Sequence, residues 1–245
     1  MSILLGGTLR RLGEHCAGSL LRAGACAGVR AVGTSAASPT KLHEVVDLEA
    51  LSREPPHAIR DIWHRRAVAR ELTLPIHAPP LNPQHARSFH EARSAHQVGL
   101  VLSAGEYVRM QERARQSPMI TLPVPKSEEQ GALVPDAFVT VLVQAQLPAI
   151  LATTVADFTE HGANAPARFQ VTVYTELAEA KDCVLVRGDI VDKGLLEWQD
   201  AAQLLRDICA MWIDDERYQH VHAFNHVPEQ FQYDAVLQLC GCKAA

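Results

Sequence analysis

The sequence contains none of the short motifs that mark the common enzyme classes. It has no Gly-x-Ser-x-Gly nucleophile elbow, no phosphate loop ending in Gly-Lys-Ser or Gly-Lys-Thr, and no dinucleotide fingerprint of three spaced glycines. It also has no apolar run long enough to span a bilayer. These absences argue against the familiar hydrolases, nucleotide-binding enzymes and membrane-spanning proteins, and they favour a binding function.

The cysteines give little support for a metal centre. Of the six, the first two lie within the first forty residues, and Cys183 and Cys209 lie in apolar segments, where we expect small buried thiols. Cys240 and Cys242 are closely spaced, but no second pair or nearby histidine completes a zinc site. We therefore predict no metal and no cofactor.

The histidines near the C-terminus leave a metal-dependent alternative open. His220 and His222 would share one face of a strand predicted over residues 218–224, and His226 follows closely. Three histidines could supply metal nitrogens, and a small metal-dependent enzyme using them is one alternative function. No carboxylate recurs beside them at strand spacing, and Asn225 would break the register before His226. We therefore predict that these histidines are structural.

Residues 1–40 differ in composition from the rest of the chain. They contain four arginines against one acidic residue, Glu14, and leucines recur among the arginines, which predicts a basic amphipathic helix. The continuous apolar centre of a secretory signal is missing. This composition is typical of a mitochondrial transit peptide. We expect residues 1–40 to direct import, a disordered tail being the alternative.

The remainder of the chain is acidic. The full sequence has 23 basic and 28 acidic residues, and subtracting the four and one in residues 1–40 leaves 19 and 27, a net charge near −8. Proteins that bind nucleic acid or anionic membranes normally present a basic face. We therefore expect no nucleic-acid partner and no membrane insertion.

Short apolar segments predict an α+β fold with a largely antiparallel sheet. The run from Val184 to Ile190 is bounded by turn formers, which predicts a strand that is covered on both faces. Most strand candidates are joined by connections too short for helical crossovers, which favours antiparallel pairing. We predict six to seven strands, at 98–102, 120–124, 138–146, 149–154, 169–177, 184–190 and 218–224.

Helices are expected to flank this sheet. A helix over 197–213 carries an apolar stripe and is predicted to pack across a sheet face. An earlier helix begins near Pro55 and places Ile59, Ile62 and Trp63 on one face. Those three side chains either pack on the core or bind a partner.

The chain is predicted to have four parts. Prolines at 75, 79, 80 and 83 are too frequent for regular structure and indicate a linker. The predicted parts are a transit peptide at 1–40, an N-terminal helical segment at 41–70, a Pro/His-rich linker at 71–95 and an α+β core at 96–242.

Several segments, in order, resemble a known family from Val46 to about Leu239. They are similar to the mitochondrial assembly chaperones that hold the unassembled beta subunit of the catalytic head of ATP synthase. The segments that carry the resemblance are DLEALSREPPHAIRDIW, LVLSAGEYVRMQERARQSPMITLPVP, FTEHGANAPARFQVTVYTEL, VLVRGDI and FNHVPEQFQY.

The resemblance implies a non-enzymatic α+β protein in the mitochondrial matrix, monomeric when free, whose partner is the free beta subunit. Aromatic and aliphatic side chains should meet an exposed apolar patch on that partner. The predicted contacts are Ile59, Ile62, Trp63, Phe224, Asn225 and Phe231. Besides the metal-dependent enzyme, a carrier of an apolar ligand on the concave face of the sheet is a further alternative.

Overall fold

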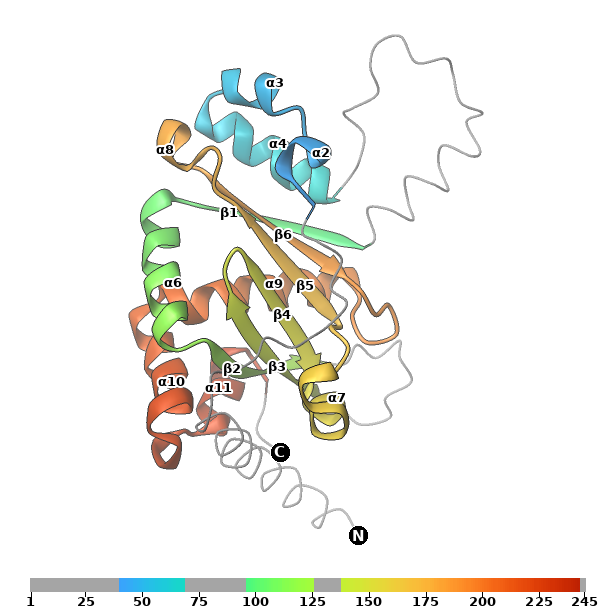
Figure 1. Cartoon of the computed structure of the whole chain (residues 1–245), viewed down its shortest axis with the longest axis vertical. Helices are drawn as coiled ribbons and strands as arrows, with labels where there is room; N and C mark the ends of the chain where they lie inside the picture. The colour runs from blue at the N-terminus through green and yellow to red at the C-terminus, as the bar shows by residue number, and fades with distance from the viewer. Residues whose placement is uncertain (1–39, 69–95, 126–137, 243–245) are drawn as a thin grey trace.

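The computed structural model describes residues 40–68, 96–125 and 138–242. The transit peptide predicted at 1–40 lies outside these residues except for its last position, and the linker predicted at 71–95 lies outside them entirely. The described chain forms the predicted α+β fold, with helices arranged around a curled sheet (Figure 1). None of the described helices has the length and apolar content needed to cross a membrane.

The sheet has six strands, and every neighbouring pair is antiparallel. Its spatial order is β1-β6-β5-β4-β3-β2. The predicted strand near Pro123 forms an edge of the sheet, and the predicted hairpin pairs Gln146 with Ala149. The strands are β1 (Gln97–Leu102), β2 (Met119–Pro125), β3 (Phe138–Gln146), β4 (Ala149–Thr154), β5 (Phe169–Tyr174) and β6 (Val184–Ile190).

One face of the sheet forms the main core with α9 (Trp198–Ile213). Because side chains alternate along a strand, Val98 of β1, Val171 of β5 and Val186 of β6 point to this face. The stripe predicted on the helix is confirmed, since each of its members is buried: Ala201, Leu204, Leu205, Ile208 and Trp212.

The strand predicted over 218–224 is wrong, because these residues belong to α10 (Asp215–His226). The side chain of Asp214 accepts hydrogen bonds from the amides of Glu216 and Arg217, which is a typical helix N-cap. Val221 and Phe224, three residues apart, form the buried side of the helix. A 3-10 turn at Pro228–Gln230 and α11 (Tyr233–Leu239) then complete the C-terminal layer.

Shorter helices occupy the connections of the sheet. α6 (Ala104–Gln116) begins with a capping box, in which Ser103 and Glu106 bond to each other's backbone amides. α7 (Val155–His161) follows β4 directly and is capped by Thr154. A 3-10 turn at Gly162–Asn164 leads towards β5, and α8 (Ala178–Lys181) lies between β5 and β6.

The opposite face of the sheet carries the N-terminal helices α2 (Leu42–Val45), α3 (Leu48–Arg53) and α4 (Pro56–Val68). We call residues 42–68, which contain these three helices, the N-terminal cover. In Figure 1 they gather, in blue and cyan, at the end of the sheet formed by β1 and β6, away from α10 and α11. Pro56 opens α4, as the sequence predicts, and α4 packs against β1.

Candidate protein-binding surface

The predicted contact residues of the leading helix lie between the cover and the sheet. Ile59 and Trp63 are buried, with exposed fractions of 0% and 3%, and Ile62 is partly buried. Of the two possibilities that the sequence leaves open for these side chains, packing on the sheet is the one that the structure shows. In this conformation only Ile62 offers part of its surface to a partner.

Three strands provide the apolar row beneath α4. Val101 of β1 pairs with Leu185 of β6, and Leu185 pairs with Tyr174 of β5, so these side chains stand in line across the sheet. We call Val101, Leu185 and Tyr174 the covered row. Their positions alternate with those of the main core, which shows that α4 and α9 lie on opposite faces.

Trp63 is the central contact between the cover and the sheet. Its indole Nε1 donates a hydrogen bond of 3.0 Å to the carbonyl oxygen of Val186. Its ring meets that of Tyr174 edge to face, with centroids 6.1 Å apart and an interplanar angle of 77°. The indole is therefore held by apolar packing and by a buried polar bond.

The hydroxyl of Tyr174 lacks a hydrogen-bond partner within the part of the chain that the structure describes. Tyr174 is only 4% exposed, and burial raises the pKa of its hydroxyl, an effect that the Arg187 guanidinium partly offsets by its charge and by its approach to the hydroxyl without hydrogen-bond geometry. Arg187 instead donates from Nε and Nη2 to Asp189 Oδ1, at 3.0 and 2.7 Å. A buried, unsatisfied hydroxyl destabilises the closed contact around Trp63.

The second set of predicted contacts lies at the junction of α10 with β2. Phe224 and Phe231 are buried and pack edge to face with centroids 5.0 Å apart. The Asn225 side chain bridges to the start of β2, accepting from the amide of Met119 and donating to its carbonyl at 2.6 Å. These three residues hold the fold together at this point.

The three C-terminal histidine rings do not meet at a common point. Because α10 is a helix, His222 and His226 share a face four residues apart, with ring centroids 4.7 Å apart, whereas His220 points elsewhere. His226 Nε2 instead lies 3.1 Å from the buried hydroxyl of Ser117. In residues 40–68, 96–125 and 138–242, no group of three potential ligand side chains is placed to hold a metal ion.

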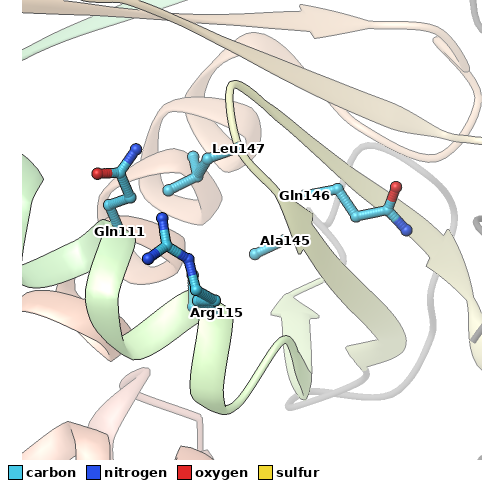
Figure 2. Close-up of a pocket in the computed structure, with 6 residues that line it drawn as sticks. Gln111, Arg115, Ala145, Gln146 and Leu147 are labelled. Atoms are coloured by element: carbon cyan, nitrogen blue, oxygen red, sulfur yellow. The ribbon is translucent and has the colours of Figure 1, made fainter. Parts of the chain in front are cut away.

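A pocket of about 430 Å³ opens between α6 and the turn that joins β3 to β4 (Figure 2). Arg115 extends from α6 towards Leu147 of the turn, and Gln146 points away from the helix. Half of the lining side chains are polar, so this pocket does not suit an apolar ligand: Gln111, Ala114, Arg115, Ala145, Gln146 and Leu147. Nor does the lining include a nucleophile paired with a base.

Sequence reasoning found the helix side of the site and missed the sheet side. The sequence alone does not show that Val101 and Tyr174 both pair with Leu185. That register depends on three separate strands of the folded sheet. The available signal was the run from Val184 to Ile190, which predicts a strand covered on both faces. That prediction is confirmed, since Val186 lies in the main core and Leu185 lies under the cover.

The buried face of α4 indicates the class of protein to which the chain belongs. A helix that packs an indole and aliphatic side chains onto a sheet face uses the same apolar contacts that bind another polypeptide. The described residues thus form an α+β protein whose candidate site is a packing surface.

The comparison with protein families identifies the particular family. A family model described as ATP11 protein matches residues 25–237, which is most of the chain. The chain therefore belongs to this family of ATP synthase F1 assembly chaperones. No curated protein matches the sequence in a direct search.

Proposed function

We propose that this chain holds the unassembled beta subunit of the ATP synthase catalytic head until that subunit meets alpha. Membership of the ATP11 protein family is the observation that carries the proposal. A free subunit of an obligate ring exposes surface that its neighbour covers in the assembled state, and such surface associates with wrong partners. Reversible masking requires binding and no chemical step, so the proposed role is not enzymatic.

The proposed location is the mitochondrial matrix, and the composition of residues 1–40 supports it. A reporter protein fused behind residues 1–40 is expected to enter mitochondria and to become protected from added protease. A matched segment with its four arginines replaced by glutamine should leave the reporter in the cytosol. Equal import of both fusions contradicts the proposal.

The proposed contact with the client, the unassembled subunit, is the apolar face of α4 formed by Ile59, Ile62 and Trp63. Two of these three side chains are buried in the free protein, and Ile62 is the accessible member. The predicted contacts Phe224, Asn225 and Phe231 are the weaker choice, because the two phenylalanines are buried at a structural junction.

Affinity purification of the tagged full chain from mitochondria tests the function. The expected result is recovery of beta subunit in clear excess over alpha. Recovery of alpha and beta in the ratio of the assembled head, or of neither, overturns the proposal.

A pair of truncations tests the contact. Ile62→Ala is expected to reduce recovery of beta severalfold, because aliphatic contacts at an interface each contribute about 1 kcal/mol or more when they matter. Val108→Ala is the matched control, because Val108 is 60% exposed on α6, outside the cover. An equal effect of both substitutions contradicts the assignment to α4.

A further inference from the structure

The cover and the sheet form a small core of their own. Five buried side chains come from the cover and four from the sheet and the β5–β6 connection, and none of them belongs to the main core. The members are Leu42, Val46, Leu51, Ile59, Trp63, Tyr174, Leu177, Cys183 and Leu185. Separation of the cover from the sheet would therefore leave the main core intact.

Few polar bonds join the cover to the rest of the described chain. Trp63 Nε1 bonds to the carbonyl of Val186, and Lys181 Nζ donates to the carbonyl of Glu54 at 3.0 Å in an exposed position. The ion pairs described within the cover, Arg53 with Glu49 and His43 with Glu44, are each internal to one helix. Among the described residues no ion pair joins the cover to the sheet.

The length of the connection allows the cover to leave the sheet without losing its tether. Positions 69–96 separate the end of α4 from the start of β1. A chain of that length spans up to roughly 90 Å when fully extended. The cover can therefore leave the sheet while it stays joined to β1.

The surface beneath α4 has the features of a helix-binding site. It receives the face of one helix that carries Ile59, Ile62 and Trp63 at positions i, i+3 and i+4. It offers the Val186 carbonyl as an acceptor and the Tyr174 hydroxyl as a polar group that α4 leaves without a partner. A different helix with a polar side chain at that point would satisfy Tyr174 better than α4 does.

The rest of the described surface offers little apolar area for holding a client. Val108 and Val191 are its exposed large hydrophobic residues, and they are far apart in the chain, Val108 on α6 and Val191 just after β6. We propose that the covered row, Val101, Leu185 and Tyr174, is a docking surface that α4 occupies in the free protein and that an amphipathic helix of the client occupies in the complex, while the released face of α4 makes its own contact with the same client. The identity of the client rests on the proposed function, whereas the surface rests on the contacts of the cover.

A labelled peptide with the sequence of α4, residues 56–68, tests the surface without the client. In the wild-type chain the tethered α4 competes with the peptide, so binding should be weak, because the competent state is only fractionally populated. The Trp63→Ala chain, whose own α4 is weakened, should bind the peptide at least tenfold more tightly. The Trp63→Phe chain keeps an aromatic ring but loses the hydrogen bond to Val186, so its affinity for the peptide should rise less. This variant replaces Trp63→Ala in the test if Trp63→Ala does not fold.

A second buried indole provides the matched control. Trp212 Nε1 donates to the carbonyl of Ser117 at 2.8 Å within the main core, so Trp212→Phe loses an equivalent bond on the other face of the sheet. Trp212→Phe should not improve peptide binding. A peptide in which the tryptophan is replaced by alanine should not bind. The surface assignment is overturned if the folded Trp63 variants gain no affinity, or if Trp212→Phe gains as much.

Competition with purified beta subunit tests the occupant. Beta subunit should displace the labelled peptide from the Trp63→Phe chain. If the tagged chain captures beta but beta does not displace the peptide, the docking proposal is wrong and the proposed function stands. If beta is not captured at all while the peptide behaves as expected, the proposed function and this occupant both fail, and the helix-binding surface remains.

Discussion

The two faces of the sheet are covered by similar side chains, but the two packing clusters differ in size. On the main face, α9 and the C-terminal helices bury Trp212, Phe169 and Phe224 in one large cluster. On the opposite face, the cover buries Trp63 against Tyr174 in a much smaller cluster. Each face holds an indole that donates to a backbone carbonyl. The two faces differ in the number of buried apolar side chains that surround the indole.

Polar bonding widens the contrast between the two faces. On the main side, Arg113 reaches the carbonyls of Trp212, Ile213 and Asp214, and Arg217 joins Asp207 to the carbonyl of Leu239. The cover has one buried and one exposed bond to the remainder of the described chain. Since local opening follows from few contacts and exposed bonds, we expect the main face to set the stability of the fold and the cover to open first.

The largest effect is expected from Trp212→Ala. Removal of a fully buried indole typically costs about 3 to 5 kcal/mol of the free energy of unfolding, and Trp212 is 0% exposed. The loss should be global, so urea unfolding followed by far-UV circular dichroism should shift as one transition. A stable variant with only local changes in amide exchange would contradict the importance of the main face.

Trp63→Ala should destabilise less and more locally. Its effect cannot exceed the free energy with which the cover docks, because the main core does not include the cover. We expect a loss of about 2 kcal/mol, below the roughly 3 to 5 kcal/mol that is usual for a buried aromatic residue, because the smaller docking free energy limits it. Hydrogen exchange should accelerate in residues 42–68 and stay unchanged in α9. Faster exchange throughout both regions would show that the two clusters act as one.

The sequence predicts most of the fold because its strongest signals are local. The run from Val184 to Ile190 and the stripe of the helix at 197–213 each specify one element with little dependence on the rest of the chain, and both are confirmed. The segment 218–224 misleads because Tyr, His and Phe alternate with other residues, while Val221 and Phe224 also fit a helix. Asp214, as the N-cap, is the local signal that favours the helix.

The candidate site is less predictable because its two halves are distant in the sequence. Trp63 and its acceptor Val186 are 123 positions apart. The spacing of Ile59, Ile62 and Trp63 predicts an apolar helix face, but it contains no information about which strands that face meets. That choice depends on the register of β1, β6 and β5, which is set by the assembled sheet.

Gly188→Ala would test the tight packing of the main face. A Cβ at Gly188 would lie 2.3 Å from Phe169 Cζ and 2.8 Å from Val98 Cγ2. Both neighbours belong to the main core, so the sheet must shift or the ring must move, and such overpacking costs roughly 1 to 3 kcal/mol. Thermal unfolding should show the loss, with peptide binding at the covered row unchanged. An unaltered midpoint would mean that the main face yields more easily than we infer.

Tyr174→Phe should act in the opposite direction on the cover. It removes a buried hydroxyl that has no partner in the described residues and keeps the ring that contacts Trp63. Removal of an unsatisfied buried polar group should stabilise the closed cover by about 1 kcal/mol. Exchange in residues 42–68 should slow and beta-subunit binding should weaken. Faster exchange would indicate that the hydroxyl supports the closed state.

The smallest expected effect is a pH dependence of the free energy of unfolding that comes from a cluster of charged residues outside the cover. Arg168, which precedes β5 outside the cover, donates to Asp157 from Nε and Nη2, both at 2.9 Å, and to Asp192 from Nη1 at 2.9 Å. The hydrogen bond from Arg168 is the main cause that lowers the pKa of Asp157. The native state then binds fewer protons than the unfolded state near pH 4, so this stabilisation is present above the ordinary carboxyl pKa of about 3.9 and is lost as the pH falls through the lower native value.

Asp157→Asn should therefore reduce the free energy of unfolding by up to about 1 kcal/mol at pH 7, since the pair is partly exposed. The difference from wild type should shrink as the pH is lowered below about 4. Glu49→Gln is the matched control in the cover, because its ion pair with Arg53 is largely exposed and water screens it. Urea unfolding at pH 7, 5 and 3 should show the pH-dependent difference for Asp157→Asn alone. If the Glu49→Gln difference changes equally with pH, the ionic contribution is not specific to the Arg168 cluster, and the contrast between the cover and the rest of the described chain reduces to their apolar packing.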